Sequence, residues 1–518
     1  MPRMSQKEEF DIVIIGAGIG GLACATYLAK QGLKVLIVEQ HYVVGGYCHS
    51  FRRRSFIFDS AVEYIGCCGK GQDITRALDL LGAQDHVSFC ELDRNGYDRL
   101  IFPKHTIHVC RGIDRYVDRL TSYFPREHRA LRKYTEVLKA IWKEVHIWGL
   151  GLYVWERGKY PCAAAFLRRY SGKTLWDLFQ DAGIRSAELR GILSGQSGNY
   201  ALPPSRVDLA TYAIIIMHLH EGAYYPRGGV QKLPDALVTA FKGYGGSLLT
   251  RREVKAIEVR NGKVVWIRLV DGRRIYTRII VSNADAKLTF LELLKGVKLP
   301  ERQIKKIEKT RPSLSSLQVY LGVTADSVER RLTAANYWVC PTYDFERLYD
   351  DLECGRKLSK KYFLLSCMSL KDDSGALAPP GYHVMKLLAP ISGKLFGEWN
   401  GTRLGQRGRE YEELKEELSD ELILEAETVV PQLRSAIRLK VIGTPLTNNY
   451  YTKAVGGAMY GPARTPDQSG PYGLTPRTGI EGLFLTGTST YYPGILGALG
   501  SGIMTGIDII RNYWKLLN

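Results

Sequence analysis

The chain has 518 residues, enough for two or three domains, and its hydrophobic content of 45% is ordinary for a globular protein with a sizeable core. Its formal net charge of +18 favours an anionic partner surface, but no nucleic-acid recognition motif accompanies that charge, so we expect no nucleic-acid partner. The ten cysteines lack CxxC spacing, so we expect neither a metal site nor a disulfide scaffold, and reduced thiols indicate a cytoplasmic protein.

The N-terminal segment, MPRMSQKEEF, is polar and leads directly into an apolar strand, so we expect no signal peptide. No window of about 18 continuous apolar residues occurs anywhere in the chain, and a transmembrane helix is therefore not expected.

The strongest local pattern is a βαβ unit that covers residues 11–46. An apolar strand, 12–15, enters the glycine loop GAGIGG, which is followed by a helix over 22–30 and a second strand over 35–38 that ends at Glu39. A glycine loop in this context is the fingerprint of a dinucleotide-binding site.

Each conspicuous residue of the unit has a physical role. Gly16 permits the tight turn, Gly18 lets a pyrophosphate approach the backbone, and Gly21 lets helix and strand pack closely. The free N–H groups at the start of the helix favour phosphate. Glu39 can accept hydrogen bonds from an adenosine ribose and would repel a 2′-phosphate, so an NADP site is disfavoured.

A second glycine pair, Gly45-Gly46, follows the acid and precedes the run FIFD at 56–59. This arrangement resembles the extended FAD fingerprint of flavoproteins with a glutathione-reductase-like nucleotide domain. The resemblance implies that the pair lies against the pyrophosphate and ribityl chain of FAD.

The middle of the chain is mostly helical over 114–180. One apolar helical face is predicted by the three- and four-residue steps between Leu131, Tyr134, Leu138, Ile141, Val145 and Trp148. The stretch from Leu150 to Tyr170 mixes aromatic with basic residues, which suits either an anionic membrane interface or a helical cap with an aromatic core.

The rest of the chain alternates between α/β and β patterns. A helix over 232–242 and hairpin-type strands around Asn261-Gly262 and Asp271-Gly272 come first. A second, antiparallel sheet is predicted from runs at 317–323, 362–366 and 383–389, followed by a charged helix at 409–427 and a last strand at 482–486.

Six motifs together resemble the phytoene desaturase superfamily, and within it most closely the carotenoid cis–trans isomerase and retinol saturase branch. They are EQHYVVGGYCHSF, FDSAVEYIG, GAYYPRGG, VSNAD, GTPLTNNYY and GLFLTGTSTYYPGILGALGSG, and they span both ends and the middle of the chain. The resemblance implies a bound FAD, with Val254 at the adenine, Gly487 near the ribityl phosphate, and the segment 495–498 beside the flavin ring at a helix N-terminus.

The predicted cofactor site combines the fingerprint with these motif positions. It consists of Gly16, Ala17, Gly18, Gly20, Gly21, Glu39, Gln40, Gly45, Gly46, Val254, Asn283, Gly487, Ile495, Leu496, Gly497 and Ala498.

Catalytic side chains are less well defined, because flavin itself exchanges hydride and a polyene has no leaving group that needs an acid. Glu63 and Tyr64 follow the FAD motifs and are candidates near the ring. His218 and His220 lie in an apolar run and would share one face if that run were a strand, although a core histidine is the commoner role.

The fold class is therefore α/β (α+β), with a glutathione-reductase-like FAD-binding Rossmann domain and a discontinuous substrate domain of antiparallel sheet and helices. The FAD domain is expected to comprise 1–80, 226–290 and 476–518, and the substrate domain 81–225 and 291–475.

The expected function is FAD-dependent isomerisation or saturation of C=C bonds in an apolar polyene, a carotenoid or retinoid, by reduced flavin at a peripheral membrane site. A phytoene-type desaturase that uses oxidised FAD is an alternative, because the branches share most motifs. Two further alternatives are a flavin amine oxidase, with Tyr491-Tyr492 in an aromatic cage around the substrate, and a prenyl-lipid escort of the GDP-dissociation-inhibitor type, which lacks flavin. No second βαβ fingerprint is present, so the redox partner is left open.

Overall fold

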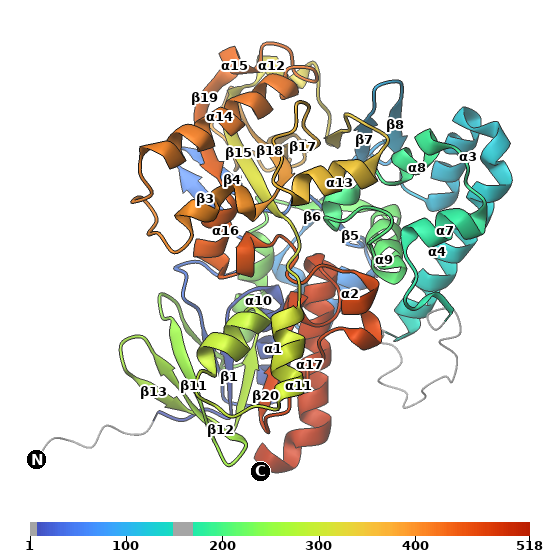
Figure 1. Cartoon of the computed structure of the whole chain (residues 1–518). Coiled ribbons are helices and arrows are strands. Elements are labelled where there is room, and N and C mark those ends of the chain that lie inside the picture. The colour runs from blue at the N-terminus through green and yellow to red at the C-terminus, as the bar shows by residue number, and fades with distance from the viewer. Residues whose placement is uncertain (1–7, 149–168, 518) are drawn as a thin grey trace, which may run out of the picture.

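The computed structural model describes residues 8–148 and 169–517. A parallel sheet lies in the lower half of Figure 1 and a mixed sheet in the upper half, with a group of helices beside them. The segment from Leu150 to Tyr170, which we considered as a membrane contact, falls outside the described residues except for its last two positions.

The parallel sheet has the strand order β10-β2-β1-β14-β20. Its strands are β1 (Ile12–Ile15), β2 (Val35–Val38), β10 (Ser247–Leu249), β14 (Ile279–Ser282) and β20 (Leu483–Leu485). Four of them are buried along their whole length, as expected for a sheet that is covered on both faces.

Helices and a second, small sheet provide those two covers. One face packs against α1 (Ile19–Lys30), α10 (Lys232–Gly243) and α17 (Gly494–Leu517). The other face packs against the antiparallel sheet of β11 (Val254–Arg260), β12 (Lys263–Leu269) and β13 (Arg274–Tyr276). The helix that we expected over 22–30 begins three residues earlier, directly on the glycine loop.

Helix α17 is long and apolar enough to cross a membrane by length and composition, with a mean hydropathy of 1.2 over Gly494–Asn512. In the protein, however, 61% of this span is buried. A Cβ at Gly502 would meet Ala23 of α1 at 2.8 Å, so the small residue allows close packing of the two helices. Among the described residues, α17 therefore has the surroundings of a core helix.

The mixed sheet has seven strands in the order β19-β15-β18-β17-β16-β7-β8. They are β7 (Asp98–Ile101), β8 (Thr106–Val109), β15 (Ser315–Thr324), β16 (Asn336–Val339), β17 (Phe363–Cys367), β18 (Tyr382–Ile391) and β19 (Ile437–Gly443). The predicted second sheet is confirmed with one difference: one of its strand pairs, β16 and β7, is parallel.

The helical region predicted around 114–180 is confirmed on the described residues. It contains α3 (Ile113–Tyr123), α4 (His128–Trp148) and α7 (Leu175–Ala182), followed by α8 (Ala187–Leu193) and α9 (Leu209–His220). The predicted apolar face of α4 is buried at Leu131, Tyr134, Leu138, Ile141 and Val145.

The remaining helices and strands complete the chain. They are β3 (Ser50–Arg53), β4 (Phe56–Asp59), β5 (Ile65–Gly66), α2 (Asp73–Leu80), β6 (Phe89–Glu91), β9 (Ala223–Pro226), α11 (Glu301–Lys309), α12 (Asp326–Glu329), α13 (Phe345–Glu353), α14 (Arg409–Ala426), α15 (Leu433–Ala436) and α16 (Pro445–Thr452).

Strands of the parallel sheet all come from the segments assigned to the FAD domain, and those of the mixed sheet from the segments assigned to the substrate domain. The small sheet β5-β9-β6 draws on both. The boundaries themselves stay a prediction.

Candidate active site

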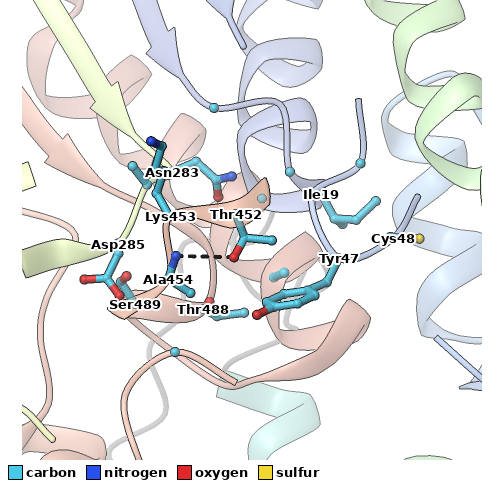
Figure 2. Close-up of a pocket in the computed structure, with 18 of the residues that line it drawn as sticks. Ile19, Tyr47, Cys48, Asn283, Asp285, Thr452, Lys453, Ala454, Thr488 and Ser489 are labelled. Carbon is cyan, nitrogen blue, oxygen red and sulfur yellow. Dashed lines mark hydrogen bonds between the residues drawn. The ribbon is translucent and has the colours of Figure 1, made fainter. Parts of the chain in front are cut away.

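A cavity of about 830 Å³ lies where the carboxyl ends of β1 and β2 meet the start of α17. Its volume falls in the range of about 300–1,000 Å³ that is usual for small-molecule sites. The cavity wall combines the first glycine loop, the segment 45–49, the start of β11, the segment 283–285 and the segment 451–454. Figure 2 shows part of this wall.

The two glycine loops, residues 16–21 and 45–46, lie against each other at the N-terminus of α1. Gly18 is the residue before the first turn of the helix, and its backbone bridges to that of Gly45. The Gly45 N–H donates to the Ala17 carbonyl at 2.8 Å. A Cβ at Gly18 would approach the Asn283 amide nitrogen to 2.7 Å, so no other residue fits here without displacing Asn283. The helix N-terminus therefore opens into the cavity.

Gly487, near the C-terminal end of the chain, packs against the first glycine loop. A Cβ at Gly20 would lie 2.6 Å from the Gly487 Cα, and Gly487 has a positive φ of 76°. Asn283 lines the cavity between them, and its backbone N–H donates to Ile15 at 2.9 Å. Residues more than 400 positions apart in the sequence thus form one backbone cradle, which suits a pyrophosphate.

Glu39 is buried at the end of β2 and lines the same cavity. Its carboxylate accepts from the Ala17 N–H at 2.7 Å and from the His41 N–H at 2.8 Å. Burial raises the pKa of Glu39, while these backbone donors oppose that shift. Further donors such as ribose hydroxyls would stabilise the ionised form, so the site fits an adenosine ribose.

The structure brings most of the predicted cofactor residues to this one cavity. Its lining includes Gly16, Gly18, Gly20, Glu39, Gln40, Gly45, Gly46, Val254, Asn283, Ile495, Leu496, Gly497 and Ala498. Ala17, Gly21 and Gly487 are not among the lining residues, but they contact lining residues, Glu39 in the case of Ala17 and Asn283 in the case of the two glycines. The role of each residue toward FAD stays a prediction.

Sequence reasoning missed several lining residues that come from loops. Asp285 and Thr488 lie inside recognised motifs and were passed over, whereas Lys453 and Ala454 directly follow one. Asp285 accepts from the Val455 N–H at 3.3 Å, and Thr452 accepts from the Ala454 N–H at 3.3 Å (Figure 2). The Asp285 contact ties the segment 451–455 to the loop after β14 of the parallel sheet, which no local pattern indicates.

Glu63 and Tyr64 line the cavity, as does His218, but His220 does not. The histidine run is helix α9 and not a strand, so side chains two positions apart point in different directions. This outcome corrects the strand-based expectation of a shared face.

Both histidines have the properties of neutral core residues. His220 shares a hydrogen bond of 2.9 Å with the Cys110 carbonyl and lies beside the Tyr116 ring. His218 shares one of 3.1 Å with the Ile214 carbonyl. Burial lowers the pKa of each to about 4, so both rings are uncharged near neutral pH.

Comparison with known proteins gives matches along nearly the whole chain. The sequence profile of the family described as "Flavin containing amine oxidoreductase" matches residues 19–509. All-trans-retinol 13,14-reductase of Danio rerio is 29% identical, over 98% of this chain and 87% of that protein. Prolycopene isomerase 1 of an Oncidium hybrid cultivar is also 29% identical, over 97% of this chain and 84% of its own.

A solved oxidoreductase from Methanosarcina mazei has the same fold, with a TM-score of 0.67 at 18% identity over 96% of this chain and all of that one. The relatives lie in the isomerase and saturase branch that the motifs indicated. Together with the dinucleotide cradle, the matching profile identifies the chain as a member of the flavin-containing amine oxidoreductase family and an FAD-dependent oxidoreductase.

Proposed function

We propose that the protein uses FAD to isomerise or saturate C=C bonds of an apolar polyene, a retinoid or a carotenoid. The observation that carries this proposal is one cavity that joins the dinucleotide cradle to an apolar wall. Similarity along the whole chain to a retinol reductase and to prolycopene isomerases supports the substrate class.

Helix α9 contributes to the apolar wall and contains no Asp, Glu, Lys or Arg within its bounds. Ile214, Ile215 and Leu219 of this helix line the cavity together with Val62 and Ile65. A polyene is recognised by apolar contact along its length, so a wall of aliphatic side chains suits it.

Bound FAD supplies hydride and electron exchange at its ring. The chain's own residues hold and shield it: the glycine loops and the start of α1 receive the pyrophosphate, and Glu39 receives the ribose. The start of α17 lies in the same wall, where its dipole favours negative charge. The aliphatic side chains exclude water from the reacting bond.

The amine oxidase alternative predicts an aromatic cage that includes Tyr491 and Tyr492. Among the described residues that line the cavity, neither occurs, and Tyr491 is 40% exposed. We therefore expect primary and secondary amines to leave the oxidised flavin spectrum unchanged without oxygen, whereas a retinoid or carotenoid perturbs it on binding. Bleaching of the flavin by an amine would overturn this assignment in favour of amine oxidation.

We further propose peripheral binding to an anionic membrane, where an apolar polyene resides. The net charge of +18 supports electrostatic attraction, at about 1 kcal/mol for each basic residue near the surface. Co-sedimentation with liposomes should rise with the fraction of anionic lipid and fall with added salt. Equal binding to neutral and anionic liposomes would remove the electrostatic part of this proposal.

A further inference from the structure

A row of buried polar side chains crosses one face of the seven-stranded sheet. Five residues stand directly opposite one another on adjacent strands: Tyr320 on β15, Lys386 on β18, Ser366 on β17, Asn336 on β16 and Asp98 on β7. The last four have no exposed surface, and Tyr320 is 6% exposed. Buried polar groups on an otherwise apolar sheet are costly unless they are paired, so their partners are informative.

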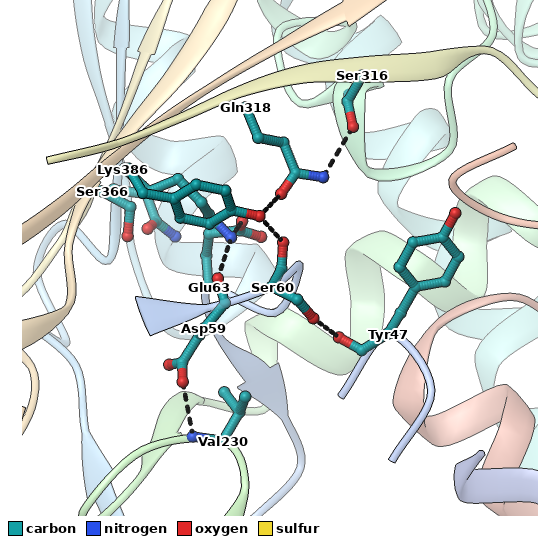
Figure 3. Close-up of polar contacts among 12 residues, drawn as sticks. Tyr47, Asp59, Ser60, Glu63, Val230, Ser316, Gln318, Ser366 and Lys386 are labelled. Atoms are coloured by element: carbon teal, nitrogen blue, oxygen red, sulfur yellow. Dashed lines mark hydrogen bonds and ion pairs between the residues drawn. The ribbon is translucent and has the colours of Figure 1, made fainter. Parts of the chain in front are cut away.

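The row holds the segment 59–64, which contributes Glu63 and Tyr64 to the cavity wall. Lys386 forms an ion pair with the Glu63 carboxylate and also donates to the Asp59 carbonyl at 3.3 Å (Figure 3). At the other end of the row, Asp98 accepts from the Tyr64 hydroxyl at 2.9 Å.

A second buried lysine strengthens the same attachment. The Lys371 ammonium donates to the Glu63 carbonyl at 3.0 Å and to the Ser366 hydroxyl at 2.6 Å. Burial lowers the pKa of Lys371 to about 8, while the nearby Glu63 and Asp98 raise it. The backbone and the carboxylate of Glu63 are thus fixed by two different ammonium groups.

In the Glu63–Lys386 ion pair, the carboxylate lies nearer the cavity than the ammonium. The Glu63 side chain is 10% exposed and lines the cavity, whereas Lys386 is fully buried behind it. The phenols of Tyr320 and Tyr460 also lie close to this carboxylate, and Asp59 and Asp98 are the next acids behind the row. The negative end of the pair therefore faces the cavity.

We propose that Lys386 is a positioning residue that keeps Glu63 ionised at the cavity wall, where Glu63 lowers the reduction potential of the bound flavin. This inference rests on the proposed placement of FAD, with the flavin ring near Ile495. Strand β5, two residues after Glu63, packs against α17, and Ile65 lines the same cavity as Ile495.

The physical reason is the charge of reduced flavin. A carboxylate raises the energy of an anionic reduced ring and so makes it a stronger hydride donor, whereas the start of α17 has the opposite effect. A C=C bond of a polyene that no electron-withdrawing group activates is a poor hydride acceptor, so a low potential suits the proposed saturation.

The test measures the flavin midpoint potential against pH, without substrate, in wild type, Glu63→Gln, Lys386→Met and the double variant. Glu63→Gln should shift the potential to more positive values at every pH. Lys386→Met removes the ammonium that pairs with the Glu63 carboxylate and should therefore add a proton-linked step to the potential. That step should be absent from the double variant. Glu292→Gln removes a carboxylate from the β11 side of the cavity and should leave the potential unchanged.

An unchanged potential in Glu63→Gln, or a proton-linked step that persists in the double variant, would overturn the inference. Each single variant leaves one member of the buried ion pair without its partner and is therefore prone to misfold, whereas the double variant removes both charges. If Lys386→Met does not fold, the comparison of wild type, Glu63→Gln and the double variant decides: both variants should have a more positive potential than wild type, with the larger shift in Glu63→Gln, which keeps the Lys386 ammonium. No polyene is present, so failure of the proposed substrate class would not alter these results.

Discussion

Gly18→Val should purify without flavin. Its Cβ alone would lie 2.7 Å from the Asn283 amide nitrogen, and the two methyl groups of valine extend further toward the space reserved for the pyrophosphate. Displacement of Asn283 would also disturb Gly487, because a Cβ there would meet the same side chain. The flavin absorbance per protein in the purified variant is the measurement.

Gly243→Val is the matched control, because this glycine at the end of α10 is exposed and has no heavy atom within 4 Å of an added Cβ. It should retain flavin at the wild-type level. Full flavin occupancy in Gly18→Val would show that the nucleotide lies elsewhere.

Glu39→Ala adds no bulk and removes only the carboxylate that accepts from Ala17 and His41. We expect weaker FAD binding by about 10- to 100-fold, equivalent to about 1.4–2.8 kcal/mol, which is the size of one or two lost hydrogen bonds to a charged group. The variant should regain its flavin when free FAD is added, unlike Gly18→Val.

The nucleotide-binding part of the site could be predicted from the sequence because its motif is formed by residues that are close together in the chain. One strand, one glycine loop and one helix lie within 20 residues, and each residue type has a steric reason for its place. Asn283 was also predicted, but only through the family motif. Its tight approach to Gly18 depends on the pairing of β1 with β14, which no local pattern specifies.

The polar row could not be predicted in the same way. Lys386 interrupts an apolar run, and Asp98 begins a strand next to Arg99, so the sequence alone indicates solvent-facing positions for both. Their burial depends on the register of strands more than 200 residues apart in the chain, as between β7 and β16. The secondary structure of the run that contains His218 and His220 could not be predicted for a different reason. A short apolar run has no periodicity that separates helix from strand.

The largest effect on chemistry is expected from the redox state of the flavin. Reduced flavin can donate hydride to a polyene or transiently add electron density that lowers the barrier to rotation about a double bond. With the flavin ring beside the start of α17, as we propose, the helix dipole would stabilise an anionic reduced ring, and the aliphatic side chains of α9 would exclude water from it. A desaturase would instead require oxidised flavin and an electron acceptor.

The most direct test reduces the purified enzyme without oxygen, adds a cis-carotenoid or a retinoid alcohol, and separates the products. We expect isomerised or dihydro product from the reduced enzyme and none from the oxidised enzyme alone. Gly18→Val, lacking flavin, should give neither under the same conditions. Product that forms only with oxidised enzyme and an added quinone or oxygen would contradict the account and identify the protein as a desaturase.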